Sequence, residues 1–204
     1  EIRSDPNLRG RIVKTRWVLI EKETETDIET IAKARLVIQG FGDPDLGEIE
    51  VASPTLGRET LPVLLQCISS FGWDLHIGDI KGAFMQSRKL NRPNGPIYAE
   101  LPSHWPVSGV SREQLVEVCV AWYGLNDGPV EFYKSLDDHL VNERSFRRSK
   151  LDPCLYYRFA GDDCSGVVGV TVDDMCYGGT DEFHHVMKEV QQRFTFGKLR
   201  IGQG

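Results

Sequence analysis

The chain has 204 residues, 40% of them hydrophobic, which is enough for a folded core and excludes a disordered tail. Lys and Arg number 24 and Asp and Glu number 30, so the formal net charge is −6 at pH 7. This balance argues against tight nucleic-acid binding by the chain alone, because phosphate contacts depend on Lys and Arg. No apolar stretch approaches the roughly 20 residues of a membrane helix, so we expect no membrane partner.

The first third of the chain predicts a β-hairpin followed by a helix. Two β-type runs, at about residues 11–20 and 32–39, flank a polar loop at 21–30. Leucines then recur at helical spacing from residue 60 to residue 71, with Pro62 in the first turn, where proline is tolerated.

A strand that ends in a carboxylate comes next. From Trp73 to Ile80 the side chains alternate, and Trp73, Leu75 and Ile77 are expected on the buried face. Asp79 stands at the end of this run. The sequence therefore predicts a half-buried strand that delivers Asp79 to an edge of a sheet.

The remaining elements alternate between loops, helices and strands. Pro, Gly and Asn are frequent at 88–95 and 102–109, which predicts loops. Apolar stripes predict helices at 130–143 and at 182–194, the second behind a capping Asp181.

Asp173 and Asp174 lie between two short β-type runs, residues 166–172 and 175–177, which is the pattern of a tight hairpin. Aspartate tolerates the positive φ that such a turn requires. An Asp-Asp hairpin taken alone is most often a solvated turn. With Asp79 it offers three carboxylates, the ligands that hard divalent cations such as Mg²⁺ prefer, and two such ions catalyse phosphoryl transfer.

At this point the chain resembles the reverse transcriptase domain of copia-type long-terminal-repeat retrotransposons. The matching blocks occur in family order across about residues 33 to 178. They are residues 33–41 (KARLVIQGF), 53–55 (SPT), 73–84 (WDLHIGDIKGAF), 122–125 (WYGL, leading to Pro129), 152–155 (DPCL) and 172–175 (VDDM).

The resemblance implies a catalytic role for Asp79, Asp173 and Asp174 as ligands of two Mg²⁺ ions, with Mn²⁺ as the alternative metal. It also implies the reaction: a primer 3′ hydroxyl attacks the α-phosphorus of a deoxynucleoside triphosphate, and pyrophosphate leaves. The expected partners are an RNA template, a DNA primer or product, deoxynucleoside triphosphates and the remaining Pol domains.

A deoxynucleotide-binding set is carried over in the same way. Arg35 matches an arginine that grips the phosphates, for which a surface arginine is the alternative. Phe84 matches an aromatic that excludes a ribose 2′ hydroxyl, for which simple core packing is the alternative. Asp127 stands where many relatives place a glutamine that contacts the sugar. Backbone close to the triphosphate is expected at Ile80, Lys81, Gly82 and Ala83.

Several departures from the family pattern keep a second hypothesis open. Thr171 replaces a common tyrosine, and Val130 and Phe132 replace a common arginine and tryptophan. A carboxylate at Asp127 would repel phosphate unless it faces away. The chain is therefore either an active polymerase of a divergent lineage or a decayed or repurposed binding module. A weaker third hypothesis is another palm-type nucleotidyl enzyme, such as a nucleotide cyclase.

We expect an α+β architecture with fingers and palm, in which helices cover one face of an antiparallel, ferredoxin-like palm sheet. Residues 1–58 are expected to form mainly the fingers hairpin and residues 59–204 mainly the palm, with part of the fingers at 85–128. We expect a fragment of a polyprotein without thumb, connection or RNase H. The resemblance implies the cytoplasm, within a virus-like particle, or the nucleus.

Overall fold

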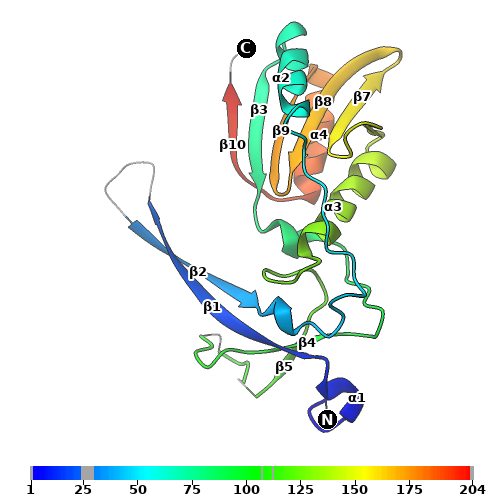
Figure 1. Cartoon of the computed structure of the whole chain (residues 1–204). Helices are drawn as coiled ribbons and strands as arrows, with labels where there is room; N and C mark the ends of the chain where they lie inside the picture. The colour runs from blue at the N-terminus through cyan, green and yellow to red at the C-terminus, as the bar shows by residue number, and fades with distance from the viewer. Residues whose placement is uncertain (1, 24–29, 107, 112, 203–204) are drawn as a thin grey trace. The chain divides into compact units, whose positions relative to one another are not determined.

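The computed structural model describes residues 2–23, 30–106, 108–111 and 113–202. Within them the chain is a mixed α+β protein with four helices and two sheets (Figure 1). It divides into two compact units, each built from two stretches of chain. The first unit comprises Glu1–Val51 and Arg88–Glu131, and the second comprises Ala52–Ser87 and Phe132–Gly204.

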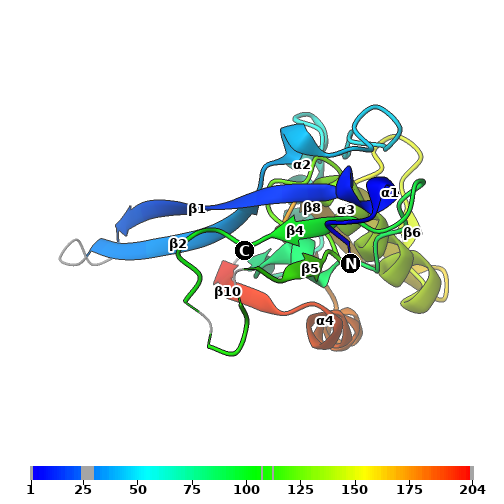
Figure 2. The ribbon, with the colours of Figure 1, turned by 90° about the horizontal axis from the view of Figure 1, so that it is seen from below.

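The first unit is built around one long strand, β1 (Ile12–Glu23). Its later part pairs with antiparallel β2 (Thr30–Ile38), and its first residues pair with parallel β4 (Tyr98–Glu100) (Figure 2). The strand β5 (Leu115–Glu117) completes the order β2-β1-β4-β5, and the short helix α1 (Pro6–Arg9) precedes the sheet. The predicted hairpin is confirmed, although residues 24–29 of its loop lie outside the described residues.

The second unit holds a six-stranded antiparallel sheet in the order β10-β3-β9-β8-β7-β6. Its helices are α2 (Thr60–Ser70), most of α3 (Gly128–Asp138) and α4 (Asp181–Arg193), and a π-helical turn, His139–Glu143, continues α3. Its strands are β3 (Leu75–Ile80), β6 (Arg147–Arg148), β7 (Leu155–Ala160), β8 (Asp163–Thr171), β9 (Asp174–Gly179) and β10 (Phe196–Gly202).

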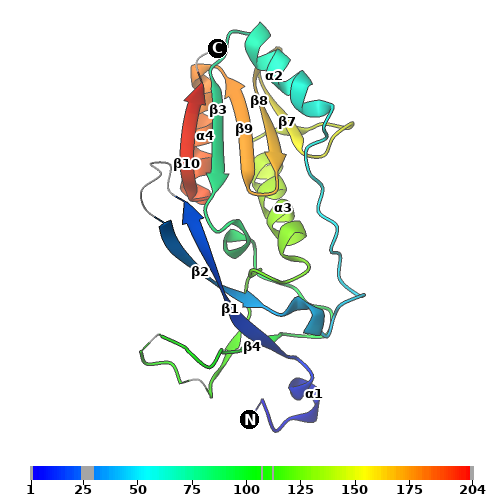
Figure 3. The same cartoon turned by 60° about the vertical axis from the view of Figure 1, so that its left-hand side comes forward.

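Helices cover both faces of this sheet, whereas we expected them on one (Figure 3). A Cβ on Gly166 of β8 would meet Phe183 of α4, and a Cβ on Gly169 would meet Leu64 of α2. Residues three apart on a strand point to opposite faces, so α4 and α2 lie on opposite sides. The absence of side chains at these glycines lets each helix pack closely.

The predicted strand at 73–80 begins two residues later than expected, and its faces differ from the prediction. Gly78 and Ile80 are buried, whereas Ile77 is 46% exposed. Leu75, on the same face, packs against the cluster of Leu64, Ile68, Trp73 and Val167, whereas Ile77 does not belong to this cluster. Asp79 shares this face with Ile77, because side chains alternate along a strand.

The turn between β8 and β9 also differs from the prediction. Thr171 pairs with Asp174, so the two turn residues are Val172 and Asp173, and Asp174 already belongs to β9. The positive φ, 57°, falls on Val172 and not on an aspartate. A β-branched residue adopts this conformation only with strain.

The two later helices agree with the prediction in extent but not in detail. The expected helix at 130–143 begins earlier, and its last turn is π-helical. The cap of α4 is Thr180, whose hydroxyl accepts the Phe183 N–H at 3.4 Å, and not Asp181.

Candidate active site

The three predicted carboxylates lie together at one edge of the six-stranded sheet. Asp79 on β3 is directly opposite Asp174 on β9. Asp173 is held beside them, because the Ile80 N–H donates to its carbonyl oxygen at 2.7 Å. Directly opposed residues on antiparallel strands have Cβ atoms about 4.5–5.5 Å apart. The fold therefore brings Asp79 next to two residues almost a hundred positions away.

The surroundings of Asp174 disfavour its ionised form. Partial desolvation, followed by the negative charges of Asp173 and Asp79, raises the pKa of the Asp174 carboxyl. Like charges placed directly opposite one another destabilise a sheet unless a cation compensates them. The cluster is thus an electronegative site whose chemistry suits a divalent cation.

The Asp79 carboxylate itself is turned toward the neighbouring strand β10. Its Oδ1 accepts the backbone N–H of Lys198 at 2.9 Å. In the described part of the chain, no three His, Cys, Asp or Glu side chains are arranged as a metal-binding group. Carboxylates are suitable ligands for Mg²⁺, and the three aspartates are neighbours in the fold. Their side-chain oxygens, however, do not converge on one point.

The segment that follows Asp79 turns sharply and carries five residues of the expected nucleotide-binding set. Gly82 takes the left-handed conformation, with φ 62° and ψ 40°, which glycine adopts at little cost. Phe84 lies in the following 3₁₀ turn and is half-buried against a core that includes Ile80 and Ala83. Lys81 is exposed.

Arg35 belongs to the first unit, on strand β2. It is directly opposite Val18 of β1, and its guanidinium carbon lies 5.5 Å from the centre of the Tyr123 ring. The register of the hairpin places Lys33 on the same face as Arg35, and Arg16 of β1 joins them. One face of the hairpin is therefore basic.

Asp127, also in the first unit, is only 4% exposed and is engaged by Arg92, whose Nη2 lies 2.9 Å from Oδ1. Arg92 also pairs with Asp43 at 3.0 Å. Burial raises the pKa of the Asp127 carboxyl even though the Arg92 charge opposes the shift. This position thus forms part of a buried ion cluster.

The same cluster contains a bidentate pair that the sequence did not reveal. Arg11 donates to both oxygens of Asp45, at 2.8 and 2.7 Å, and Asp45 is completely buried. The Arg11 guanidinium, through a hydrogen bond that outweighs burial, lowers the pKa of the Asp45 carboxyl. The two residues are 34 positions apart, and no sequence pattern relates them, so only the folded contacts disclose the pair.

The first residue of the 152–155 motif, Asp152, has a structural role in the second unit. Asp152 accepts the N–H of Gly57 at 2.8 Å and that of Cys154 at 2.9 Å. Burial opposes ionisation of Asp152, but hydrogen bonds from Thr60 and from these two N–H groups outweigh it and lower the pKa. Asp152 therefore fixes the segment before α2 to the start of β7.

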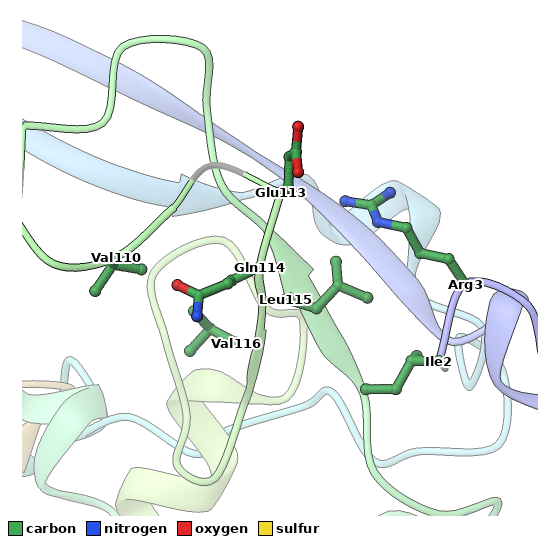
Figure 4. A pocket seen from close by; sticks show the side chains of 7 residues that line it. All are labelled: Ile2, Arg3, Val110, Glu113, Gln114, Leu115 and Val116. Carbon is green, nitrogen blue, oxygen red and sulfur yellow. The ribbon is translucent and has the colours of Figure 1, made fainter.

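An open pocket of about 570 Å³ lies in the first unit, and none of the predicted site residues lines it (Figure 4). Arg3, at its rim, pairs with Glu100 at 3.1 Å. The lining residues are Ile2, Arg3, Val110, Glu113, Gln114, Leu115 and Val116. This lining contains one carboxylate, Glu113, and so does not repeat the three-carboxylate cluster of the candidate active site.

A sequence profile of the family described as "Reverse transcriptase (RNA-dependent DNA polymerase)" matches residues 3–201. The chain belongs to this reverse transcriptase family. It is 25% identical over 174 residues to the "Retrovirus-related Pol polyprotein from transposon TNT 1-94" of Nicotiana tabacum. That match covers 84% of this chain but only 13% of the relative. The copia-type resemblance is confirmed.

The reverse transcriptase domain has no membrane-crossing helix in the part of the chain that the structure describes, since none of its helices is both long and apolar enough.

Proposed function

We propose that this chain is the polymerase part of a retrotransposon Pol polyprotein and transfers nucleotidyl groups from deoxynucleoside triphosphates to a primer 3′ hydroxyl on an RNA template. The observation that carries the proposal is the direct opposition of Asp79 and Asp174 on neighbouring strands, with Asp173 beside them, in a member of the reverse transcriptase family.

Asp79, Asp173 and Asp174 would hold the divalent cations, for which hard carboxylate oxygens are the suitable ligands. When bound, two Mg²⁺ ions, or Mn²⁺ in their place, lower the pKa of the attacking hydroxyl and neutralise charge on the leaving pyrophosphate. The register of β3 and β9 supports this assignment, because it sets Asp79 directly opposite Asp174.

The residues after Asp79 would bind the triphosphate and select the sugar. The left-handed turn at Gly82 presents backbone without a side chain, which suits a close approach by phosphate. The exposed Lys81 supplies positive charge next to it. Phe84 is half-buried, so part of its ring remains able to bar a 2′ hydroxyl.

Arg35 and Asp127 are the other two residues of the proposed nucleotide-binding set, and the support for Arg35 is stronger. Arg35, on the basic face of the β1–β2 hairpin, suits a role in gripping phosphates. Asp127 is buried against Arg92, which supports a structural role there over contact with a nucleotide.

We further propose that the first unit corresponds largely to the fingers and the second largely to a ferredoxin-like palm. The antiparallel order of the second sheet and its acidic edge support this division. The template, the primer, the nucleotides and the remaining Pol domains would then be the partners, the latter because the matched relative is a much longer polyprotein.

The test is extension of a primer on an RNA template with Mg²⁺ and deoxynucleotides, comparing the wild type with the Asp173→Asn variant. We expect the wild type to extend the primer. The extension rate of the variant should be lower by more than about 100-fold, because one metal ligand loses its charge. The matched control is Asp163→Asn at the far end of β8, which should retain activity.

The alternative is a folded module that has lost catalysis. It is favoured by Thr171 in place of a common tyrosine, by Asp127, which is buried against Arg92, and by the net charge of −6. Absence of extension by a wild type with a cooperative unfolding transition would support this alternative. Extension that persists in Asp173→Asn would contradict the assignment of the metal site.

A further inference from the structure

A β-bulge lies directly opposite Asp79. Phe196 of β10 pairs with Ile80 of β3, and the next pair joins Leu199 to Gly78. Two residues of β10, Gly197 and Lys198, thus oppose the single residue Asp79. Bulges of this kind occur next to active sites, where they re-aim a side chain.

Both residues of the bulge lie against the Asp79 carboxylate. The Lys198 N–H donates to its Oδ1 at 2.9 Å. A Cβ on Gly197 would lie 2.5 Å from Oδ2 and 2.8 Å from Oδ1, closer than any real contact. Glycine at 197 therefore provides the space that the carboxylate occupies, and the next amide holds the carboxylate there.

The start of β10 is itself tied to the segment after Asp79. The Lys81 N–H donates to the Thr195 carbonyl at 2.9 Å. The Gln86 side chain accepts the Thr195 N–H at 2.8 Å and donates to the Thr195 carbonyl at 3.2 Å. Gln86 also donates to the Lys81 carbonyl at 2.7 Å. The Gln86 side chain and the Lys81 N–H together fix the position from which the bulge reaches Asp79.

We propose that the Gly197–Lys198 bulge, anchored by Gln86, is a positioning element that orients the Asp79 carboxylate for divalent-cation binding. The inference rests on the proposed function, since it assigns these residues to the same acidic site. Carboxylates that ligate metals are generally held by hydrogen bonds from outer groups, and loss of such a partner typically weakens metal affinity or activity by about 10–100-fold.

The test measures Mn²⁺ binding to the chain by electron paramagnetic resonance, in the wild type and in Gly197→Ala. We expect the dissociation constant to rise about 10–100-fold in the variant, because the new methyl group displaces the carboxylate and breaks the Lys198 contact. The matched control is Gly202→Ala on the same strand. Its Cβ would meet nothing closer than 3.8 Å, so Mn²⁺ affinity should not change.

Gln86→Ala is the second variant, and it decides the matter if Gly197→Ala does not fold. It leaves Asp79 and the bulge residues in place and removes only the side chain that ties down Thr195. We expect weaker Mn²⁺ binding, by a smaller factor than in Gly197→Ala, with little change in melting temperature. In primer extension both variants should lower kcat and raise the Mg²⁺ concentration for half-maximal rate, while KM for the primer-template remains constant.

The outcomes separate this inference from the function on which it rests. Weaker binding in Asp79→Asn but unchanged or tighter binding in folded Gly197→Ala and Gln86→Ala would overturn the role of the bulge and leave the metal site intact. Wild-type binding no stronger than that of Asp79→Asn would overturn both.

Discussion

A single buried carboxylate, Asp127, shows how strongly context decides the role of a residue. By its place in the sequence it belongs to a nucleotide-binding set, yet it lies 4% exposed beside Arg92. The surrounding cluster holds the three acids Asp43, Asp45 and Asp127 against the two bases Arg11 and Arg92. Asp127 thus helps to hold the first unit together. The two arginines balance the charge of the three acids only in part.

We expect Asp127→Ala to lower the free energy of unfolding by about 1–3 kcal/mol, because the buried Arg92 loses one hydrogen-bond acceptor, although Asp43 and Asp45 still balance its charge. The KM for deoxynucleotides should change by less than about twofold. Urea denaturation and steady-state extension measure the two quantities. Asp127→Asn retains an acceptor for Arg92 and should cost less stability. A large rise in KM with unchanged stability would instead show that Asp127 faces the nucleotide.

At the scale of secondary structure, the packing of α4 depends on missing side chains in the sheet. The Phe183 ring is fully buried and occupies the space above Gly166 of β8 and Gly179 of β9. Thr180 sets the start of α4 so that Phe183 falls at this place. Glycine usually weakens a strand, but here it makes room for an aromatic ring, and burying such a ring contributes substantially to stability.

Gly166→Ala should therefore lower the free energy of unfolding by about 1–3 kcal/mol through overpacking against Phe183. The smaller side chain of Phe183→Leu should partly relieve that clash, so the double variant should be more stable than the sum of the single effects predicts. Chemical denaturation of the four proteins measures the coupling. Strict additivity would contradict the proposed contact.

At the scale of the molecule, two histidines of the second unit link its stability to pH. His139, in the π-helical turn, is 2% exposed, and its Nδ1 lies 2.9 Å from Glu143. Burial lowers its pKa even though Glu143 opposes the shift. His76 stacks on Tyr177 and lies 4.4 Å from the His184 ring, and burial with the His184 charge lowers its pKa too.

When folding lowers the pKa of a histidine, the unfolded chain takes up the proton at a higher pH than the folded protein does. Its stabilising contribution is therefore complete above the unfolded value of about 6.5 and is lost as the pH falls from there toward the folded value. We expect denaturant midpoints to fall between pH 7.5 and pH 5.5 and His139→Gln to flatten that dependence. An equal slope in the variant would show that other groups cause it.

The sequence by itself predicted the local elements and singled out the three aspartates that lie close together in the fold. Periodicity of 3.6 or 2 residues located the hairpin, α2 and α4, and the ordered motifs indicated the family and drew attention to Asp79, Asp173 and Asp174, because these signals depend on neighbours along the chain. Tertiary structure decided which face of β3 is buried, that Asp127 pairs with Arg92, and that Asp79 is bound by a bulge 119 residues away. Register, burial and charge pairing arise from contacts between distant segments, and no local pattern encodes them.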